Sequence, residues 1–262
     1  MTREAYNALD GVNFSTMKEL LRSPRHYQTA LHEVREPEDE AKFSLGSAAH
    51  AALLEDADIS TLFAIKPDGM KFTTNEGKMW KALQKLPILA AKDAASVSAM
   101  VAVARAHPDA SAALAACPHR EDSLAYRLDS VDCKGLLDAW GRDATGAPVI
   151  VDYKTTTDAR PEAFIRSVME YHYDLQMHVY RSLLQEHLAG EAPSFIWIVQ
   201  EKTPPYAVNV FVPDDSIYES GRKKFVRCLN LLLTCRSTGE WPAYAPGIKP
   251  LSLPKWALKE AA

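Results

Sequence analysis

The chain has 262 residues, of which 47% are hydrophobic and 24% are charged, and its formal net charge is −4. This length and apolar content allow a large domain with a sizeable core, while the acidic balance excludes a chain-wide basic field as the means of binding nucleic acid. No apolar run reaches the roughly 18 residues that a membrane span needs, so we expect no membrane partner. The first residues lack the layout of a secretory signal, and the four cysteines lie far apart, which predicts reduced thiols in a cytoplasmic protein.

Residues 1–116 carry mostly helical patterns. Ser15 and Ser23 are typical helix caps and predict two short helices near the N-terminus. The alanine- and leucine-rich stretch 43–55 predicts a helix that is packed on much of its circumference, with His50 inside it. Further helical patterns, interrupted at prolines, occupy residues 75–86 and 93–107.

The pattern changes to strands in the second part of the chain, residues 117–262. Three β-compatible runs joined by turns predict a meander of adjacent strands, at 123–128, 133–140 and 147–154. Two helices, two strands and a long helix are predicted to follow, at 161–171, 173–188, 194–202, 206–213 and 215–237. We therefore predict an α/β fold for a single domain over 1–262, with a mixed central sheet flanked by helices and a helical N-terminal portion.

The segment "VDYKT" (151–155) ends a short apolar run and predicts a strand that carries an acid and a lysine two positions apart. Side chains alternate along a strand, so Asp152 and Lys154 share one face while Tyr153 points to the other. Asp138 lies near the end of the preceding predicted strand, so both carboxylates can meet at one edge of the sheet. Paired carboxylates suit a hard cation, and a neighbouring lysine can orient a water molecule or offset charge on a phosphoryl group.

Each of these features also has a structural interpretation. An acid and a lysine two positions apart on a strand commonly form a surface ion pair. A histidine on an alanine-rich helix is commonly a core residue. The spacing alone therefore leaves the roles of Asp152, Lys154 and His50 open.

The order of several longer motifs gives a resemblance to a nuclease family. A carboxylate, then [DE]-x-K on the next strand, then Q-x-x-x-Y on a helix is the core pattern of the RecB-like PD-(D/E)xK nucleases. Asp138 and residues 152–154 match its first two parts, and Gln176 with Tyr180 matches the third. The chain more closely resembles the nuclease domain of RecE-type phage exonucleases (exonuclease VIII). That match covers essentially the whole chain and includes "STMKELLRSPRHY", "LGSAAHAALLE", "VDYKTTTDARPEAF", "YHYDLQMHVY", "PPYAV", "TGEWPAY" and "LPKWA".

The resemblance implies a metal site. In that family the histidine of a G-x-x-x-H helix joins two acids and a backbone carbonyl around the metal. The corresponding groups in this sequence are His50, Asp138, Asp152 and the carbonyl of Tyr153. The implied metal is Mg²⁺, with Mn²⁺ as a substitute, and an imidazole is an acceptable ligand in such a mixed site. Lys154 would then act on the attacking water.

Further residues have both a functional and a structural interpretation. Gln176 and Tyr180 lie four apart on one helical face, where the resemblance implies a contact to a DNA strand or to the catalytic lysine, and packing is the alternative. Glu121 matches an acid often found in the family, as a further ligand or a base, and an exposed strand glutamate is the alternative. Thr155 and Thr156 can donate hydroxyl groups to a phosphate or cap the following helix. Other candidates for phosphate contacts are Lys78, Lys81, His172, His178, Arg222, Lys223, Lys224 and Arg227.

The resemblance implies an exodeoxyribonuclease that degrades one strand of duplex DNA from 5′ to 3′ and leaves a 3′ single strand for a phage-type single-strand annealing recombinase. It further implies a bacterial or phage-encoded homotetramer that forms a ring around the duplex. The sequence has neither C-x-x-C spacing nor a P-loop pattern, which predicts no iron–sulfur cluster and no use of ATP. Two alternatives remain: an endonuclease or repair nuclease on the same core, and a non-catalytic DNA-binding module.

Overall fold

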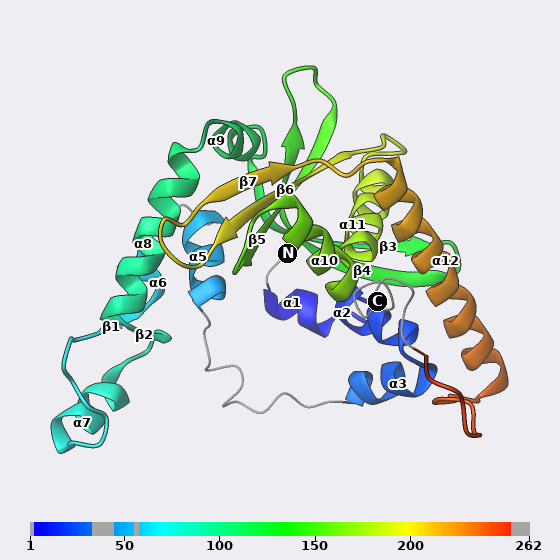
Figure 1. The fold of residues 1–262 in the computed structure, drawn as a ribbon, viewed down its shortest axis with the longest axis horizontal. Helices are drawn as coiled ribbons and strands as arrows, with labels where there is room; N and C mark the ends of the chain where they lie inside the picture. Colours follow the sequence, from blue (N-terminus) through cyan, green and yellow to red (C-terminus); the bar gives the residue numbers. More distant parts are fainter. Residues whose placement is uncertain (1–2, 33–44, 55–57, 253–262) are drawn as a thin grey trace, which may run out of the picture.

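The structure is a computed structural model that describes residues 3–32, 45–54 and 58–252. A central sheet of five strands carries helices on both of its faces, and a smaller unit projects from one side (Figure 1). The predicted α/β fold with a mixed central sheet flanked by helices is confirmed.

The central sheet has the strand order β3-β4-β5-β6-β7. β3 (His119–Leu128), β4 (Val131–Arg142) and β5 (Pro148–Thr156) form the predicted antiparallel meander. β6 (Ser194–Glu201) pairs with β5 in parallel, and β7 (Val208–Phe211) pairs with β6 in antiparallel orientation. β5 therefore has an antiparallel neighbour on one side and a parallel neighbour on the other.

The parallel pairing of β5 and β6 requires a crossover connection. α10 (Pro161–Tyr171) and α11 (Tyr173–His187) supply it, with bounds close to those predicted from the sequence. α11 packs on β3, β4 and β6, and α12 (Asp215–Thr238) packs on α11. These helices bury one of the two large apolar clusters of the described residues, which includes Ile150 and Trp197.

The opposite face of the sheet is covered by α5 (Leu45–Leu54), α8 (Ala91–Ala106) and α9 (Pro108–Ala115). The second apolar cluster lies here and includes Val149 and Val151 of β5, whose side chains alternate with Ile150 of the first cluster. Because both faces are covered, the first four residues of β5 are apolar, and the strand stays buried through Asp152 and Tyr153.

Residues 3–32 form four short helices. They are α1 (Arg3–Ala8), α2 (Phe14–Met17), the 3₁₀ helix η1 (Lys18–Leu21) and α3 (Pro24–His32). Of these, α2 contacts α11, and η1 and α3 contact α12. Ser23 caps α3 as predicted, since its hydroxyl accepts a hydrogen bond from the His26 backbone N–H at 3.3 Å. The predicted cap at Ser15 is wrong: Asn13 accepts from the Thr16 N–H at 2.9 Å. The chain reaches this point from a bridge with β4, so the helix begins two residues earlier than the serine suggested.

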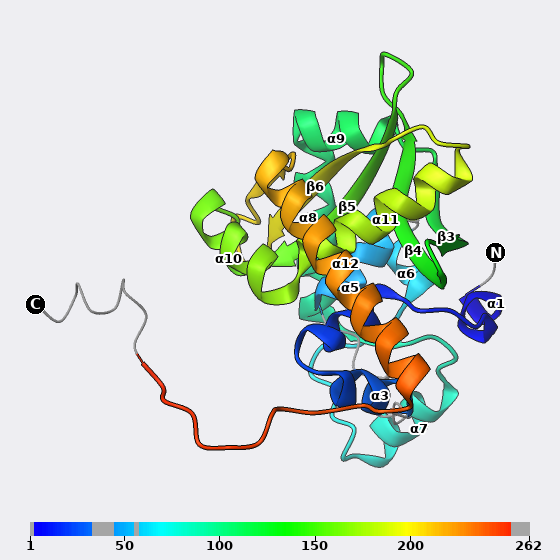
Figure 2. The ribbon, with the colours of Figure 1, turned by 90° about the vertical axis from the view of Figure 1, so that its right-hand side faces the viewer.

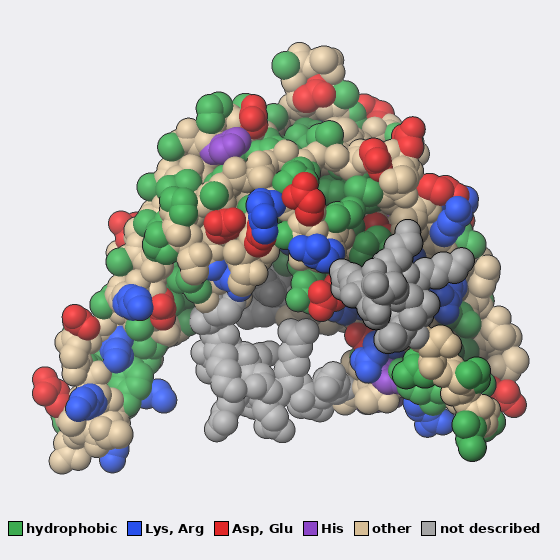
Figure 3. Space-filling model, viewed as in Figure 1, with side chains coloured by type: hydrophobic (Ala, Val, Ile, Leu, Met, Phe, Trp, Pro, Cys, Tyr) green, Lys and Arg blue, Asp and Glu red, His purple; other side chains and the backbone are tan. Residues whose placement is uncertain are grey.

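The projecting unit follows the short helix α6 (Ile59–Leu62). It consists of β1 (Ala64–Lys66), α7 (Asn75–Leu83) and β2 (Ile88–Ala90), and we call residues 64–90 the finger. β1 and β2 form a parallel pair that was not predicted, because three-residue strands are too short to show alternation. The finger extends away from the sheet in both ribbon views (Figures 1 and 2), and Lys and Arg side chains gather on it (Figure 3).

The described residues up to Ala115 are helical apart from β1 and β2, and all strands of the central sheet follow. That the whole chain forms a single domain stays a prediction. None of the helices in the described ranges is long and apolar enough to cross a bilayer. All four cysteines are buried.

Candidate metal and phosphodiester site

Three carboxylates lie side by side across β3, β4 and β5. The β3–β4 register places Glu121 opposite Asp138, and both residues are outside the regular ladder. The β4–β5 ladder ends at Ala139 opposite Val151. The next opposed positions are Asp138 and Asp152. This register agrees with the expectation that the two acids lie close together, and, besides burial, the charge of Asp138 acts to raise the pKa of Asp152.

A local irregularity turns the side chains of β3 and β4. Glu121 has a φ of 45°, in the left-handed region that a non-glycine residue rarely adopts. On β4, Leu137 and Trp140 pack in the same core cluster, although regular alternation would place residues three apart on opposite faces. The strands therefore carry a bulge-like distortion at Glu121 and Asp138, a device that re-aims side chains next to functional sites.

His50 of α5 reaches the same acids. Its Nε2 lies 2.9 Å from Asp138 Oδ2, and its Nδ1 lies 3.4 Å from Glu121 Oε1. α5 can approach the sheet closely because Ala48 and Ala49, next to the histidine, are fully buried small residues. Ligand atoms of His50, Glu121 and Asp138 all lie within 4.8 Å of one another, a spacing that a single ion can bridge.

The charges of His50 and Asp138 depend on each other. Burial lowers the pKa of His50, yet the carboxylates of Asp138, Glu121 and Asp152 together outweigh burial and raise this pKa to about 9. Burial also acts to raise the pKa of Asp138, but the imidazolium and the Lys154 ammonium hold it below its usual range. The imidazolium is thus the cation that the carboxylates hold here. A metal would have to displace its proton, because only a neutral imidazole can be a ligand.

Asp152 and Lys154 form a second, more deeply buried pair. Asp152 is fully buried, and its Oδ2 lies 2.5 Å from Lys154 Nζ. No hydrogen-bond donor within the described ranges reaches Asp152 Oδ1. Burial raises the pKa of Asp152 to about 6, against the opposing charge of Lys154. A buried carboxylate oxygen without a donor is a group that a bound cation would satisfy.

Tyr153 points away from its two neighbours, as the alternation predicted. Its ring lies in the cluster under α5 and α8, and its hydroxyl donates to Gln200 Oε1 at 2.6 Å. Its backbone N–H donates to Asp138 Oδ2 at 2.8 Å. The Asp138 carboxylate therefore takes the place of a backbone partner for β5 at this position.

The donor set fits a hard divalent cation with one imidazole ligand. The closest cluster contains Glu121 together with the predicted His50 and Asp138. Asp152 lies outside that cluster and contacts Lys154 instead, although it is near enough for its charge to raise the pKa of His50. Glu121 thus has a more central position than its sequence context suggested, because the β3–β4 register, which brings it beside Asp138, is not visible in a spacing.

Gln176 and Tyr180 share one face of α11, and Gln176 Nε2 donates to Tyr180 Oη at 3.2 Å. Both residues are only 9% exposed. The Tyr180 ring packs over Gly135 of β4, where an added Cβ would lie 3.1 Å from the ring. These contacts agree with the packing interpretation, and a contact of either residue with DNA stays a prediction.

A polar hollow of about 150 Å³ opens beside Lys154. Thr155 and Thr156 line it, together with Tyr173 and Lys202, which the sequence analysis did not single out. Tyr173 holds the lysine, since Lys154 Nζ lies 4.7 Å from the centroid of its ring. Tyr173 lies three residues before Gln176 and therefore on the same face of the helix, which could have identified it in the sequence as a candidate site residue. Lys202 follows β6, and only the parallel register with β5 brings it near.

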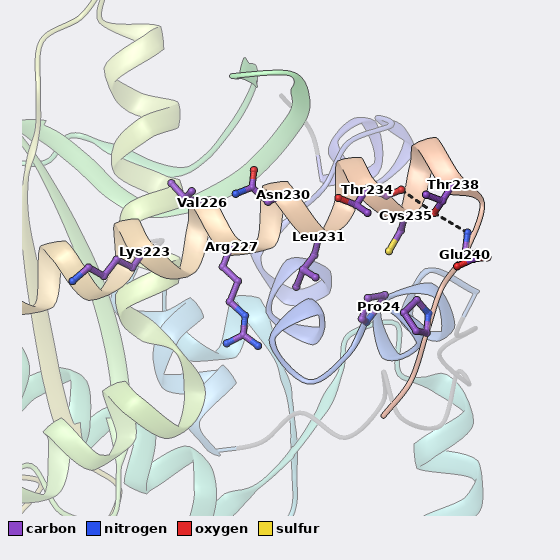
Figure 4. A pocket seen from close by; sticks show the side chains of 11 residues that line it. Pro24, Lys223, Val226, Arg227, Asn230, Leu231, Thr234, Cys235, Thr238 and Glu240 are labelled. Atoms are coloured by element: carbon purple, nitrogen blue, oxygen red, sulfur yellow. Dashed lines mark hydrogen bonds between the residues drawn. The ribbon is translucent and has the colours of Figure 1, made fainter. Parts of the chain in front are cut away.

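The predicted cations of α12 lie away from the carboxylates. Lys224 pairs with the buried Asp174 at 2.7 Å, which ties α12 to α11. Arg222 and Lys223 contact Glu219 on their own helix. A groove of about 570 Å³ runs along α12 (Figure 4), and its lining includes the predicted cations Lys223 and Arg227 but none of the site carboxylates, His50 or Lys154. This groove is therefore separate from the candidate site.

A solved structure shares the fold of the whole chain. It is named "Putative exonuclease", comes from Eubacterium rectale, and aligns over 96% of both chains with a TM-score of 0.60 at 11% identity. A second solved structure, SSO0001, aligns over 81% of this chain and 84% of its own at 13% identity, with a TM-score of 0.29 that carries no argument. No curated protein sequence matches the chain. Residues 13–251 match a nuclease-like family, and the chain belongs to this family, the PDDEXK-like domain of unknown function (DUF3799).

Proposed function

We propose that this protein is a Mg²⁺-dependent exodeoxyribonuclease of the RecE type. The observation that carries the proposal is the buried pair of Asp152 and Lys154 at the end of β5, with Asp138 and His50 beside it. A surface ion pair would be solvated, whereas Asp152 is fully buried with one oxygen that lacks a donor. Membership in a PDDEXK-like family supports phosphodiester hydrolysis as the chemistry.

The groups that would hold the metal are His50, Glu121, Asp138, Asp152 and the carbonyl of Tyr153. Mg²⁺ supplies a water of lowered pKa and polarises a phosphoryl oxygen when it is bound, and Mn²⁺ can replace it. Glu121 is either a ligand or a base for that water. The carboxylates must be ionised and the histidine neutral for this purpose, and an incoming divalent charge favours both changes.

The Lys154 ammonium is the group that would act on the reacting phosphate. Asp152 and the Tyr173 ring fix its position at the end of β5. From there it can orient the water and offset charge on the pentacovalent phosphate, with no reorganisation needed during the reaction. Thr155 and Thr156 line the hollow next to it and can donate to a neighbouring phosphate. Gln176 would help to place the strand.

The proposed substrate is the end of a DNA duplex, one strand of which is removed from 5′ to 3′. Motif resemblance over the whole chain supports this polarity, and the name of the E. rectale protein points to exonuclease activity in a relative of the same fold. By the same resemblance, the product is a 3′ single strand for an annealing recombinase, and the working form is a homotetrameric ring.

The test is digestion of linear duplex DNA labelled separately at its 5′ and 3′ ends, beside a covalently closed circle, with and without Mg²⁺. We expect early release of the 5′ label, an intact circle and no reaction by Lys154→Ala. The matched control is Arg142→Gln. It removes a cation of β4, on the same sheet as Lys154, from an exposed ion pair with Glu191, and it should retain full activity.

Other outcomes of this experiment select other functions. Cleavage of the circle would show an endonuclease. Release of the 3′ label first would reverse the polarity. No Mg²⁺-dependent cleavage of any substrate, together with retained DNA binding, would leave a non-catalytic DNA-binding module.

A further inference from the structure

The finger has a local excess of positive charge on an acidic chain. It contains five lysines against Asp68 and Glu76, a net charge of +3, whereas the whole chain carries −4. Lys71, Lys78 and Lys85 are exposed. Across the part of the chain that the structure describes, no acidic side chain lies within ion-pair distance of their amines. Three unpaired cations on one projecting unit (Figure 3) form a surface for an anionic partner.

Other residues set the internal fold of the finger. The Phe72 ring stacks on Trp80 with centroids 6.3 Å apart. The amines of Lys66 and Lys81 lie 5.4 Å and 5.5 Å from the Phe72 centroid. Gly77 lets the preceding loop lie directly on α7, since an added Cβ would be 2.1 Å from a backbone oxygen of that loop. The finger therefore has its own internal packing, and it presents Lys71, Lys78 and Lys85 without using their amines for that packing.

Exposed apolar side chains lie among these lysines. Met79, Leu83 and Leu86 are 68%, 76% and 42% exposed. Large apolar side chains are not expected on a surface that contacts only water. A nucleic-acid backbone, in contrast, has apolar sugar surface next to each phosphate. The combination of cations and exposed apolar groups fits that backbone.

The finger directly precedes α8, the helix against which α5 packs, and α5 carries His50. β2 ends at Ala90 and α8 begins at Ala91, while α5 packs along α8. α7 and α3 both lie below the sheet as drawn in Figures 1 and 2. The 16-residue α8 spans roughly 24 Å, which corresponds to about seven base-pair steps. A polymer that enters the candidate site from that side can therefore reach the finger a few base pairs away.

We propose that the finger binds the phosphate backbone of duplex DNA through Lys71, Lys78 and Lys85, several base pairs from the bond that is cut. This inference rests on the proposed function, because the candidate site calls for a polymeric phosphodiester rather than an acidic protein. In this proposal the finger binds the substrate and takes no part in the hydrolysis.

The test compares two triple variants that remove the same charge. The finger variant is Lys71→Gln, Lys78→Gln and Lys85→Gln. The control variant is Arg22→Gln, Arg127→Gln and Arg142→Gln, which changes exposed arginines that each lie beside an acid outside the finger. Fluorescence anisotropy with a labelled duplex is measured in Ca²⁺ over a range of salt concentrations, so that binding is read without cleavage.

We expect the finger variant to bind at least tenfold more weakly near 0.1 M salt. The slope of log K against log salt should become shallower by about 2 to 3, because each lost phosphate contact removes about 0.9. The control variant should keep the slope of the unmodified protein, and arginine at the three finger positions should restore it. Equal slopes for the finger and control variants would overturn the proposal, and so would a changed oligomeric state with unchanged DNA binding.

A small substrate separates this inference from the proposed function. Thymidine 5′-(p-nitrophenyl phosphate) is too short to reach the finger from the candidate site. We expect the finger variant to hydrolyse it with unchanged kcat/KM while its KM for duplex DNA rises. If the unmodified protein cleaves nothing but the salt slopes still differ, the nuclease proposal fails and the finger remains a DNA-binding surface.

Discussion

His50 Nε2 lies 2.9 Å from Asp138 Oδ2, which joins a helix of the N-terminal portion to a strand of the central sheet through one pair of charges. The same carboxylate oxygen accepts the Tyr153 backbone N–H at 2.8 Å. A proton on the imidazole therefore occupies the electrostatic position that a metal ion would take. Protons and metal ions are expected to compete for this site.

The first prediction concerns that competition. Because the neighbouring carboxylates, Asp138 foremost, raise the pKa of His50 to about 9 against the effect of burial, the ring is protonated at pH 7.5 and must lose about one proton when a metal binds. Titration calorimetry with Mn²⁺ in buffers of different ionisation enthalpy measures the protons released. His50→Gln should bind the metal more weakly and release about one proton fewer. Equal proton release by both proteins would exclude His50 as a ligand.

The second prediction concerns stability in EDTA. The pKa of His50 in the folded protein, about 9, is above the value near 6.5 expected when unfolded. Its stabilisation is therefore complete below pH 6.5 and disappears as the pH rises through about 9. The loss should amount to roughly 3 kcal/mol. Urea unfolding at intervals from pH 6 to pH 9.5 measures it, and His50→Gln should show a much flatter dependence over the same range.

The third prediction concerns the Asp152–Lys154 pair. Lys154→Ala should lower the cleavage rate by a factor on the order of 10² to 10³ or more and retain metal binding. It should also cost about 3 to 5 kcal/mol of folding stability, because the buried Asp152 loses its counter-charge.

A double-mutant cycle separates these two effects. Asp152→Asn should weaken metal binding and abolish cleavage. The variant with both substitutions should be more stable than Lys154→Ala alone, since no buried charge is left without a partner. A cycle with no coupling between the two positions would contradict the buried pair.

The fourth prediction concerns Tyr180. Tyr180→Phe removes the oxygen that accepts from Gln176 Nε2 and should cost about 1 kcal/mol of stability. Because Tyr180 is only 9% exposed, the KM for duplex DNA should stay the same. Chemical denaturation and steady-state kinetics measure the two quantities. A raised KM with unchanged stability would instead assign the hydroxyl to a DNA contact.

The sequence allowed most elements of the sheet and its covering helices to be predicted. The apolar runs and turns around β4 and β5 marked the meander, and the helix predicted over 161–171 has the bounds of α10. Alternation alone placed Asp152 and Lys154 on one face. These predictions succeed because they depend on neighbours along the chain.

Features that depend on distant segments could not be predicted from local pattern. His50 is 88 positions from Asp138, and only the resemblance suggested that they meet. Glu121 reaches the cluster because its backbone has a positive φ, and no residue type in β3 predicts that conformation. The pairing of β1 with β2 involves three residues on each strand, too few for a period to appear.

The two neighbours of β5 do not end together. Its ladder with β4 stops at Val151, whereas its ladder with β6 continues to Thr156. The N–H and C=O groups of one strand residue point toward the same edge. The Tyr153 N–H donates to Asp138 on the β4 side of β5, so the Tyr153 carbonyl also points toward β4. The β4–β5 ladder has already ended at this position. Because β4 separates from β5 five residues before β6 does, the sheet leaves a main-chain oxygen beside the carboxylates. In the proposed metal site this oxygen would be a ligand that no substitution of a side chain can remove.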